Sequence, residues 1–172
     1  MTFESHIGRM YESDVWYAYL HVPAKIAEPF ITEDDHKYRV ILTLNDTATW
    51  HCALMPRGDG NFFINVNKEI RTRLGLEENT RVTATIEKDT SKYGMELPAE
   101  LSELFLLDPE GEAVFHRLTP GKQRTLIYQI AKPKGAATRV RKAVNTIEYL
   151  KSTGGRLDYK ELNEAYRERR FT

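Results

Sequence analysis

The sequence predicts an α+β protein in which a sheet precedes a group of helices. Up to about residue 90, apolar and β-branched residues occur in short alternating runs that end at turn residues, as they do in strands. Beyond that point apolar residues recur at helical spacing, and proline follows a capping residue at the start of several runs. Because the two patterns occupy separate parts of the chain and do not alternate, a parallel βαβ arrangement is not expected.

Four segments of the first part carry the strand pattern. They are residues 14–22, 38–44, 48–55 and 61–66. The second and third flank the polar run Asn45-Asp46-Thr47, which predicts a hairpin. The run Arg-Gly-Asp-Gly that follows Pro56 predicts a tight turn.

Residues 65–87, NVNKEIRTRLGLEENTRVTATIE, predict a strand, a short helix and a second strand. Ile70 and Leu74 are four residues apart and share one helical face. Gly75 suits the left-handed position that ends a helix, after which Leu76 can fold back onto Ile70. A helix of about two turns is not stable alone. We therefore expect Ile70, Leu74 and Leu76 to cap the core at one end of the sheet.

Residues 88–98 fit neither periodicity and predict a linker to a helical region. The helices predicted beyond it cover residues 98–107, 108–118, 119–131, 137–152 and 158–169. Asp108 and Thr119 each precede a proline and are predicted N-caps, and Asp158 starts a capping box with Glu161. In the fourth helix Val140, Val144, Ile147 and the pair Tyr149-Leu150 are expected to face one side.

The formal net charge of zero hides a segregation along the chain. Residues 1–116 hold 11 lysines and arginines against 20 acids, whereas residues 117–156 hold 10 against one. Seven cations fall within 21 residues that contain no acid: Lys122, Arg124, Lys132, Lys134, Arg139, Arg141 and Lys142. Either they pair with acids of an acidic β domain, or they bind an anionic partner such as nucleic acid, lipid headgroups or lipopolysaccharide.

Signals for enzymatic chemistry are absent from the sequence. The five histidines show no ligand spacing with one another or with the single cysteine, Cys52. There is no nucleophile elbow, phosphate loop or dinucleotide fingerprint. We therefore predict no catalytic, cofactor or metal site, and expect a protein that is not an enzyme. No apolar run approaches a membrane span and the N-terminus does not resemble a secretory signal, so we expect a cytoplasmic protein.

Two stretches resemble known families. Residues 54–89 resemble a small β-barrel domain of unknown function found in many bacterial proteins, and residues 97–152 resemble the YdeI/OmpD-associated or bacteriocin-protection family. The second resemblance rests on Pro98, Asp108, Phe115, Leu118-Thr119-Pro120, Gln123-Arg124, Ala131-Lys132 and Thr138-Arg139. The family usually has a lysine-proline-glutamate-threonine-arginine run, where this chain has the longer KPKGAATR without the glutamate.

The resemblance implies a small closed barrel of the double-split, AbrB-like type in residues 1–92, followed by a helical tail in residues 93–172. It also implies a role in tolerance of antimicrobial peptides or envelope stress. It supplies no catalytic residue and no cofactor. Together with the basic run, it indicates a binding protein for a protein or an anionic envelope component.

Two other functions stay open. AbrB-like barrels bind DNA as dimers, and candidate DNA contacts surround the short helix: Lys68, Arg71, Arg73 and Arg81. Nucleic acid is the less favoured partner, because acidic residues interrupt this group. A small molecule could instead bind in a pocket lined by Trp16, Tyr17, Trp50 and Phe62. The sequence leaves open whether the protein is a monomer or a dimer.

Overall fold

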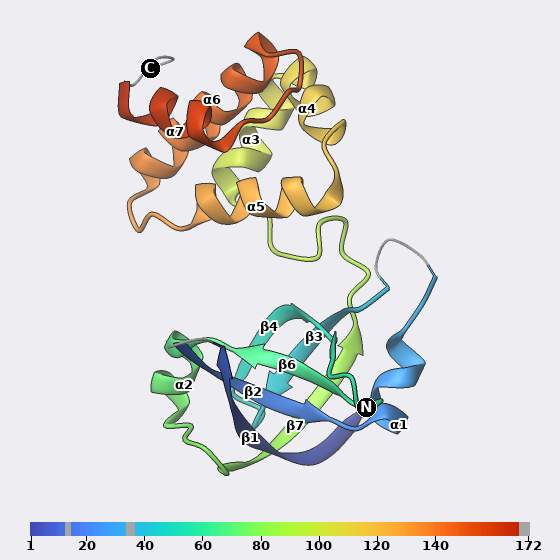
Figure 1. Ribbon diagram of the computed structural model, residues 1–172. Coiled ribbons are helices and arrows are strands. Elements are labelled where there is room, and N and C mark those ends of the chain that lie inside the picture. Colours follow the sequence, from blue (N-terminus) through green and yellow to red (C-terminus); the bar gives the residue numbers. More distant parts are fainter. Residues whose placement is uncertain (13–14, 34–36, 169–172) are drawn as a thin grey trace. The chain divides into compact units, whose positions relative to one another are not determined.

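The computed structural model describes residues 1–12, 15–33 and 37–168, apart from the side chains of residues 11–16. The chain divides into two compact units, Met1–Met95 and Glu96–Thr172. The first contains a sheet and short helices, and the second is helical (Figure 1). The α+β class, with the sheet preceding the helices, is therefore confirmed. None of the described helices is long and apolar enough to cross a membrane.

The sheet of the first unit is antiparallel throughout. Its described strands run in the order β4-β3-β7-β1-β2-β6-β5. Their bounds are β1 Thr2–Glu12, β2 Val15–Val22, β3 Arg39–Leu44, β4 Ala48–Ala53, β5 Met55–Pro56, β6 Phe62–Val66 and β7 Arg81–Lys88. Three short helices accompany them: α1 Ala24–Ala27, the 3₁₀ helix η1 Glu28–Phe30 and α2 Lys68–Leu74.

The two edges of this sheet are consecutive in the sequence. Only the buried residue Leu54 separates β4 from β5, so one extended segment pairs first with β3 and then with β6. β5 is two residues long and ends at Pro56, which has no backbone N–H to donate. No described ladder joins β4 to β5 or β6, so the sheet curls without closing. The closed barrel expected from the resemblance is not confirmed.

The sequence pattern predicts no strand before residue 14, yet β1 lies near the middle of the sheet, between β7 and β2. Gly8 interrupts its apolar pattern, which explains the omission. Gly8 pairs with Tyr19 of β2, and a Cβ atom at Gly8 would lie 2.3 Å from Cζ of Tyr19. The glycine is needed because the tyrosine ring covers it, an arrangement that compensates for a glycine within a strand.

Helix α2 closes one end of the sheet as predicted. It joins β6 to β7, which are not neighbours in the sheet, and it buries Ile70 and Leu76 while Leu74 packs against the same core. Asn67 caps the helix by accepting a hydrogen bond from the Ile70 N–H at 2.9 Å. Gly75 ends it in the left-handed conformation, with φ of 60°. The predicted strand–helix–strand unit is confirmed.

Part of the predicted linker is folded against the first unit. Asp89 is fully buried, and its Oδ2 lies 2.9 Å from Nδ1 of His51 on β4. Its Oδ1 accepts hydrogen bonds from the N–H and hydroxyl of Ser91, at 3.0 and 2.6 Å. Tyr93 is buried as well. Residues 89–94 are therefore a packed strap and not a free linker.

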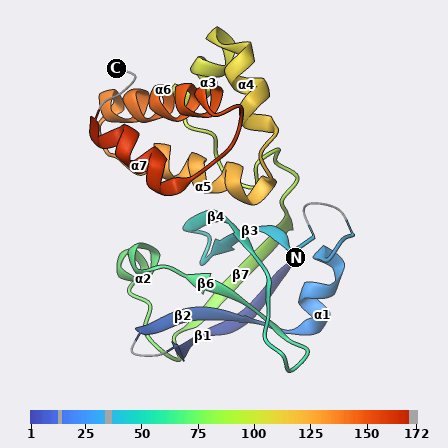
Figure 2. The same cartoon turned by 45° about the horizontal axis from the view of Figure 1, so that its top comes forward.

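The second unit consists of helices packed around one central helix, α6 (Figure 2). The bounds are α3 Ala99–Leu107, α4 Pro109–His116, α5 Pro120–Ala131, α6 Ala136–Ser152 and α7 Tyr159–Glu168. Helix α6 contacts each of the other four and buries Ala143, Ile147 and Leu150 among them. The five predicted helices are confirmed.

Asp108 and Asp158 form the predicted capping hydrogen bonds, whereas Thr119 stands at the N-cap position of α5 without one from its side chain. Asp108 accepts a hydrogen bond from the Gly111 N–H at 2.9 Å, and Asp158 accepts one from the Glu161 N–H at 3.2 Å. The Glu161 side chain does not complete the capping box, because it accepts from the Tyr149 hydroxyl at 2.9 Å. The Tyr149 hydroxyl, on α6, also accepts a hydrogen bond from the N–H of Asp158, the residue before α7, and so joins the two helices.

A pair of glycines tests the packing of α4 on α6. A Cβ atom at Gly111 would lie 2.3 Å from Cγ2 of Ile147, whereas one at Gly121 would meet nothing within 4 Å. We expect Gly111→Ala to lower the free energy of unfolding of the helical unit by about 1–3 kcal/mol. The matched variant Gly121→Ala should leave it unchanged or raise it by up to about 1 kcal/mol. Urea unfolding followed by far-ultraviolet circular dichroism compares the two, and equal losses would contradict the close contact.

A second prediction concerns the buried carboxylate of the strap. Burial opposes the ionisation of Asp89, but hydrogen bonds from Ser91 and His51 outweigh it and hold the pKa of Asp89 below the usual aspartate range. We expect Asp89→Ala to lower the free energy of unfolding of the first unit by about 1–3 kcal/mol at neutral pH, because the donors on Ser91 and His51 lose their acceptor. Since the pKa of Asp89 is lowered on folding, this contribution is lost as pH falls through the folded-state pKa.

Tryptophan fluorescence measures this loss in one unit, because both tryptophans, Trp16 and Trp50, precede residue 96. The control is Glu87→Ala, which removes an exposed carboxylate from β7. If the two variants unfold at the same urea concentration, the strap is not anchored through Asp89.

Candidate functional site

The division into units changes the predicted charge distribution. Residues 1–95 hold 11 basic residues against 14 acids, a balance of −3, and residues 96–172 hold 14 against 11, a balance of +3. Six acids that the chain places before residue 117 belong to the helical unit: Glu96, Glu100, Glu103, Asp108, Glu110 and Glu112. The β unit is therefore acidic as expected, but less strongly than the balance of the first 116 residues indicates. The helical unit carries acids of its own near the predicted cations.

Two of the seven predicted cations, Arg139 and Lys142, form contacts within the helical unit. Arg139, in the first turns of α6, places Nη2 and Nε at 2.7 and 2.8 Å from Oε1 of Glu100 on α3. Its Nη1 donates to the backbone carbonyls of Pro133 and Lys134, at 3.1 and 2.8 Å. The hydrogen bond from Arg139 holds the pKa of Glu100 below the usual glutamate range. Arg139 thus joins α3, α6 and the loop before α6.

Lys142 is also engaged inside the helical unit. Its Nζ donates to the Gln129 carbonyl of α5 at 3.2 Å and lies 5.0 Å from the ring centroid of Tyr166 on α7. Burial, and then the neighbouring charge of Lys132, lower the pKa of Lys142. Lys142, which belongs to α6, therefore contacts both α5 and α7.

The other five cations form no ion pair with any described carboxylate. They are Lys122, Arg124, Lys132, Lys134 and Arg141, and each is exposed or half-buried. Together with Tyr128 and Val140 we name them the cationic surface. Arg124, Tyr128 and Lys132 are spaced four residues apart, so they follow one side of α5 and its C-terminal end.

Exposed apolar side chains lie among these cations. The Tyr128 residue is 57% exposed and Val140, which precedes Arg141, is 48% exposed. Val140 shares a helical face with Ile147, as predicted, but it is not buried. Ala143 and Ile147, three and seven residues further on, are buried, whereas Val140 stands in the second turn of α6, near the exposed start of the helix. The cationic surface therefore combines positive charge with apolar area.

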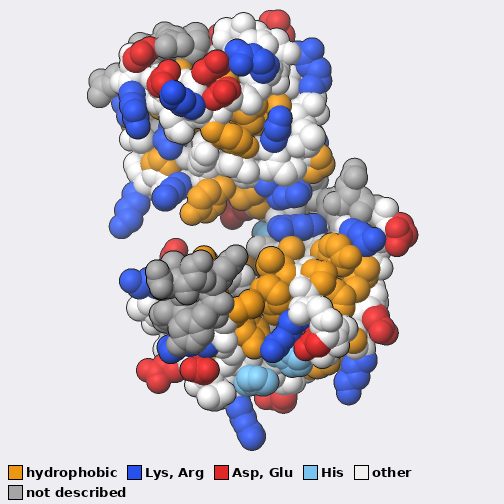
Figure 3. All heavy atoms as spheres, in the orientation of Figure 1, with side chains coloured by type: hydrophobic (Ala, Val, Ile, Leu, Met, Phe, Trp, Pro, Cys, Tyr) orange, Lys and Arg blue, Asp and Glu red, His pale blue; other side chains and the backbone are white. Residues whose placement is uncertain are grey.

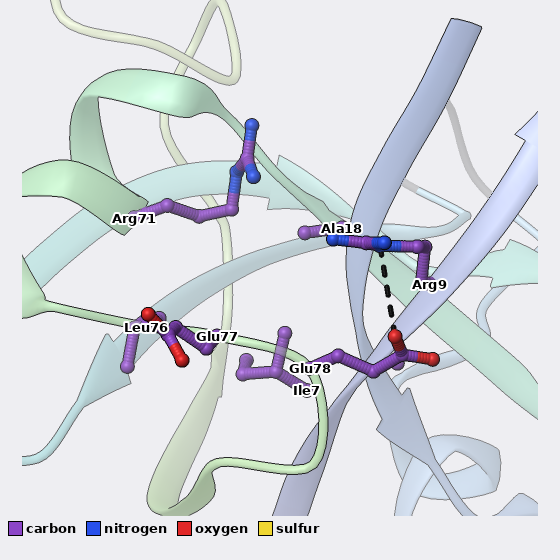
Figure 4. A pocket seen from close by; sticks show the side chains of 8 residues that line it. Ile7, Arg9, Ala18, Arg71, Leu76, Glu77 and Glu78 are labelled. Carbon is purple, nitrogen blue, oxygen red and sulfur yellow. Dashed lines mark ion pairs between the residues drawn. The ribbon is translucent and has the colours of Figure 1, made fainter.

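The four candidate DNA contacts do not form one group. Lys68, Arg73 and Arg81 are exposed, whereas Arg71 is half-buried and lines a pocket with Arg9 of β1 (Figure 4). Arg71 and Arg73 are two positions apart on α2, so their side chains leave opposite sides of the helix. Arg9 was not singled out by the sequence, because no pattern marks a residue that reaches α2 from a distant strand.

None of the described pockets joins Tyr17 to Trp50 and Phe62 of the predicted aromatic pocket. Trp50 and Phe62 pack against the core of the first unit, and the side chain of Trp16 lies outside the described residues. Tyr17 instead lines an apolar pocket of about 250 Å³ with Met10, Tyr19, Met55 and Phe63. Figure 3 shows hydrophobic side chains gathered over one face of the β unit.

Cys52 and the histidines show no reactive arrangement in the described part of the chain. Burial raises the pKa of the Cys52 thiol to about 12, so the reactive thiolate is scarce at neutral pH. No group of three or more potential metal ligands occurs among the described residues. His51 contributes its hydrogen bond to the buried carboxylate of the strap.

The chain matches two family profiles. Residues 3–86 match a domain described as "Domain of unknown function (DUF1905)". Residues 94–152 match a family described as "Bacteriocin-protection, YdeI or OmpD-Associated". The chain is a DUF1905 domain followed by a bacteriocin-protection, YdeI or OmpD-Associated domain. The resemblance drawn from the sequence is thereby confirmed. No curated protein matches the chain.

The two domains divide the candidate residues between them. The cationic surface and Arg139 lie in the bacteriocin-protection domain, whereas Arg9 and Arg71 lie in the DUF1905 domain. Neither description names a catalytic residue or a substrate. The physical properties of the two sites therefore carry the functional argument.

Two neighbouring arginines should separate structural from available cations. Arg139→Ala removes the contacts to Glu100, Pro133 and Lys134, and we expect it to lower the Tm of the helical unit by several degrees. Arg141→Ala should leave the Tm nearly unchanged, because no described acid pairs with Arg141. The Tm difference should narrow at acid pH. The lowered pKa of Glu100 means that its stabilisation is present above the usual glutamate range and lost as pH falls through the folded-state pKa.

Circular dichroism thermal scans at neutral and acid pH measure these differences. A Tm for Arg141→Ala as low as that of Arg139→Ala would contradict the assignment of Arg141 to the available group.

Proposed function

We propose that the protein is a non-catalytic binding protein whose bacteriocin-protection domain attaches to an anionic component of the bacterial envelope. The single observation that carries this proposal is the cationic surface. Its five cations lack an acidic partner among the described residues, and exposed Tyr128 and Val140 lie among them. A location on the cytoplasmic side fits, since the cytoplasmic leaflet of membranes carries negative charge.

The two kinds of side chain would act together at an anionic lipid surface. Each lysine or arginine close to such a surface contributes about 1 kcal/mol of attraction. Exposed apolar side chains add affinity when they enter the boundary between headgroups and acyl chains. A surface with both properties therefore suits an amphiphile with anionic headgroups better than a purely polar polyanion.

Nucleic acid is the second candidate partner. Phosphates attract the same cations, but binding of this kind falls steeply with salt and makes no use of exposed apolar side chains. Lys68, Arg73 and Arg81 would add to it only if the DUF1905 domain also took part. Tyr128 and Val140 therefore distinguish the two partners, because they should contribute to binding of an anionic lipid surface and not to binding of nucleic acid.

Reversal of the available cations provides the test. The triple variant Lys132→Glu, Lys134→Glu, Arg141→Glu spares Arg139 and Lys142, which hold the fold. We expect it to weaken binding to vesicles containing an anionic phospholipid by roughly a hundredfold or more, at about 1 kcal/mol for each lost cation. Vesicle sedimentation at two salt concentrations measures the change, with zwitterionic vesicles as the baseline.

The matched control reverses three exposed cations of the other domain, Lys68→Glu, Arg73→Glu and Arg81→Glu, and should bind as the wild type does. A wild-type protein that ignores anionic vesicles, or equal losses in the two triple variants, would refute the proposal. Tyr128→Ser with Val140→Ser should weaken vesicle binding but not binding to single- or double-stranded DNA. DNA binding that exceeds vesicle binding and survives this double change would favour the nucleic-acid alternative.

A further inference from the structure

A pocket in the DUF1905 domain forms where the end of α2 meets β1 and β2. Its volume is about 460 Å³ (Figure 4). Ile7, Ala18 and Leu76 supply an apolar lining, and each of these residues is buried. The guanidinium groups of Arg9 and Arg71 and the carboxylates of Glu77 and Glu78 supply charge around it. The volume lies within the range of pockets that hold small molecules.

Arg9 occupies a position where strand alternation calls for an apolar side chain. Ile7, two residues earlier on β1, points into the core, and alternation directs Arg9 to the same face. Its partner across the ladder is Ala18, which is 3% exposed and faces the core as well. Arg9 projects from this face beside the pocket, where its side chain is 33% exposed, and a charged residue in this place departs from the apolar pattern around it, as residues of functional sites often do.

Arg71 reaches the same space from the other side. It follows the buried Ile70 on α2, is itself half-buried, and extends its side chain from the helix toward the side of the pocket where Arg9 lies (Figure 4). Arg9 and Arg71 are 62 positions apart in the sequence, so the fold brings two cations to one cavity. Two positive charges that share a pocket repel each other, and an anion bound between them lowers the electrostatic energy. Paired guanidinium groups match the geometry of carboxylate and phosphate oxygens.

Glu78 now contributes part of the balancing charge. Its Oε2 lies 3.7 Å from Nε of Arg9, and its side chain is 48% exposed. An ion pair that is long and open to water contributes little energy. An oxyanion with better geometry would therefore displace the Glu78 carboxylate from Arg9.

We propose that this pocket binds a small molecule that carries a carboxylate or a phosphate group on an apolar body. The oxyanion lies between Arg9 and Arg71, and the apolar body rests on Ile7, Ala18 and Leu76. Glu78 competes with the ligand for Arg9. This site is separate from the cationic surface, and its ligand is a small molecule and not an envelope component.

Phenyl phosphate and benzoate are suitable probes, with benzyl alcohol as the neutral analogue and inorganic phosphate as the anion without an apolar body. Isothermal titration of the protein with both domains present measures the binding of each probe. We expect saturable binding of at least one aromatic anion, and at least tenfold weaker binding of benzyl alcohol and of inorganic phosphate. The tighter of the two aromatic anions identifies the class of the oxyanion.

Three substitutions are expected to have different effects on binding of the aromatic anion. Arg71→Gln should weaken binding of the aromatic anion at least tenfold, whereas Glu78→Gln should tighten it severalfold by removing the competing carboxylate. Arg73→Gln, which removes an exposed arginine of the same helix outside the pocket, should change nothing. A loss of folding cannot imitate this pattern, because a damaged pocket does not bind more tightly.

The proposal is overturned if the wild-type protein binds neither aromatic anion. It is also overturned if Arg71→Gln and Arg73→Gln bind equally well, or if Glu78→Gln weakens binding. If inorganic phosphate binds as tightly as phenyl phosphate, the apolar lining has no role and the proposed ligand class is wrong. None of these outcomes bears on vesicle binding by the bacteriocin-protection domain, so the two proposals fail independently.

Discussion

Burial of α6 is the constraint on which the helical unit depends. Four helices contact it, and its apolar stripe through Ile147 and Leu150 is almost fully removed from water. This orientation decides what each neighbouring cation can do. Arg139 is brought to Glu100 and Lys142 to the Gln129 carbonyl, while Arg141 has no acidic partner among the described residues and Val140 stays exposed. The separation of structural cations from available ones is thus a consequence of apolar packing.

The first unit depends on a comparable constraint in its sheet. One segment that passes through Leu54 supplies both edge strands, so the sheet must curl for β3 and β6 to pair with it. Curling encloses the core, and α2 covers one end. The helix is only seven residues long, and the pocket of Arg9 and Arg71 lies beside its C-terminal end. A short edge strand that ends in proline also offers little backbone for pairing with another chain.

The net charges of the two units differ less than the segregation of charge along the sequence indicates. Each unit departs from neutrality by three charges, in opposite directions. Local arrangement therefore matters more than net charge. The cationic surface spreads its charge over α5, α6 and their connection, which suits a partner with many anionic groups. The pocket concentrates two guanidinium groups around a small apolar cavity, which suits a single oxyanion.

The sequence by itself determined the elements whose geometry is encoded by neighbouring residues. The turn at Asn45-Asp46, where both residues have positive φ, the left-handed Gly75 and the Asp108 cap all follow from interactions within about four residues. The five helices and the family resemblance follow from patterns of the same local kind. The strand around Gly8 was missed because its glycine is explained only by Tyr19, which a separate strand supplies.

Only the tertiary structure decided how the side chains of distant elements meet. His51 and Asp89 are 38 residues apart, and Glu100 and Arg139 are 39 apart, so no local pattern pairs them. The curling of the sheet through Leu54, the exposure of Val140 and the meeting of Arg9 with Arg71 have the same origin. Each depends on strand register and on which helix faces which, and these are set by burial of the whole core.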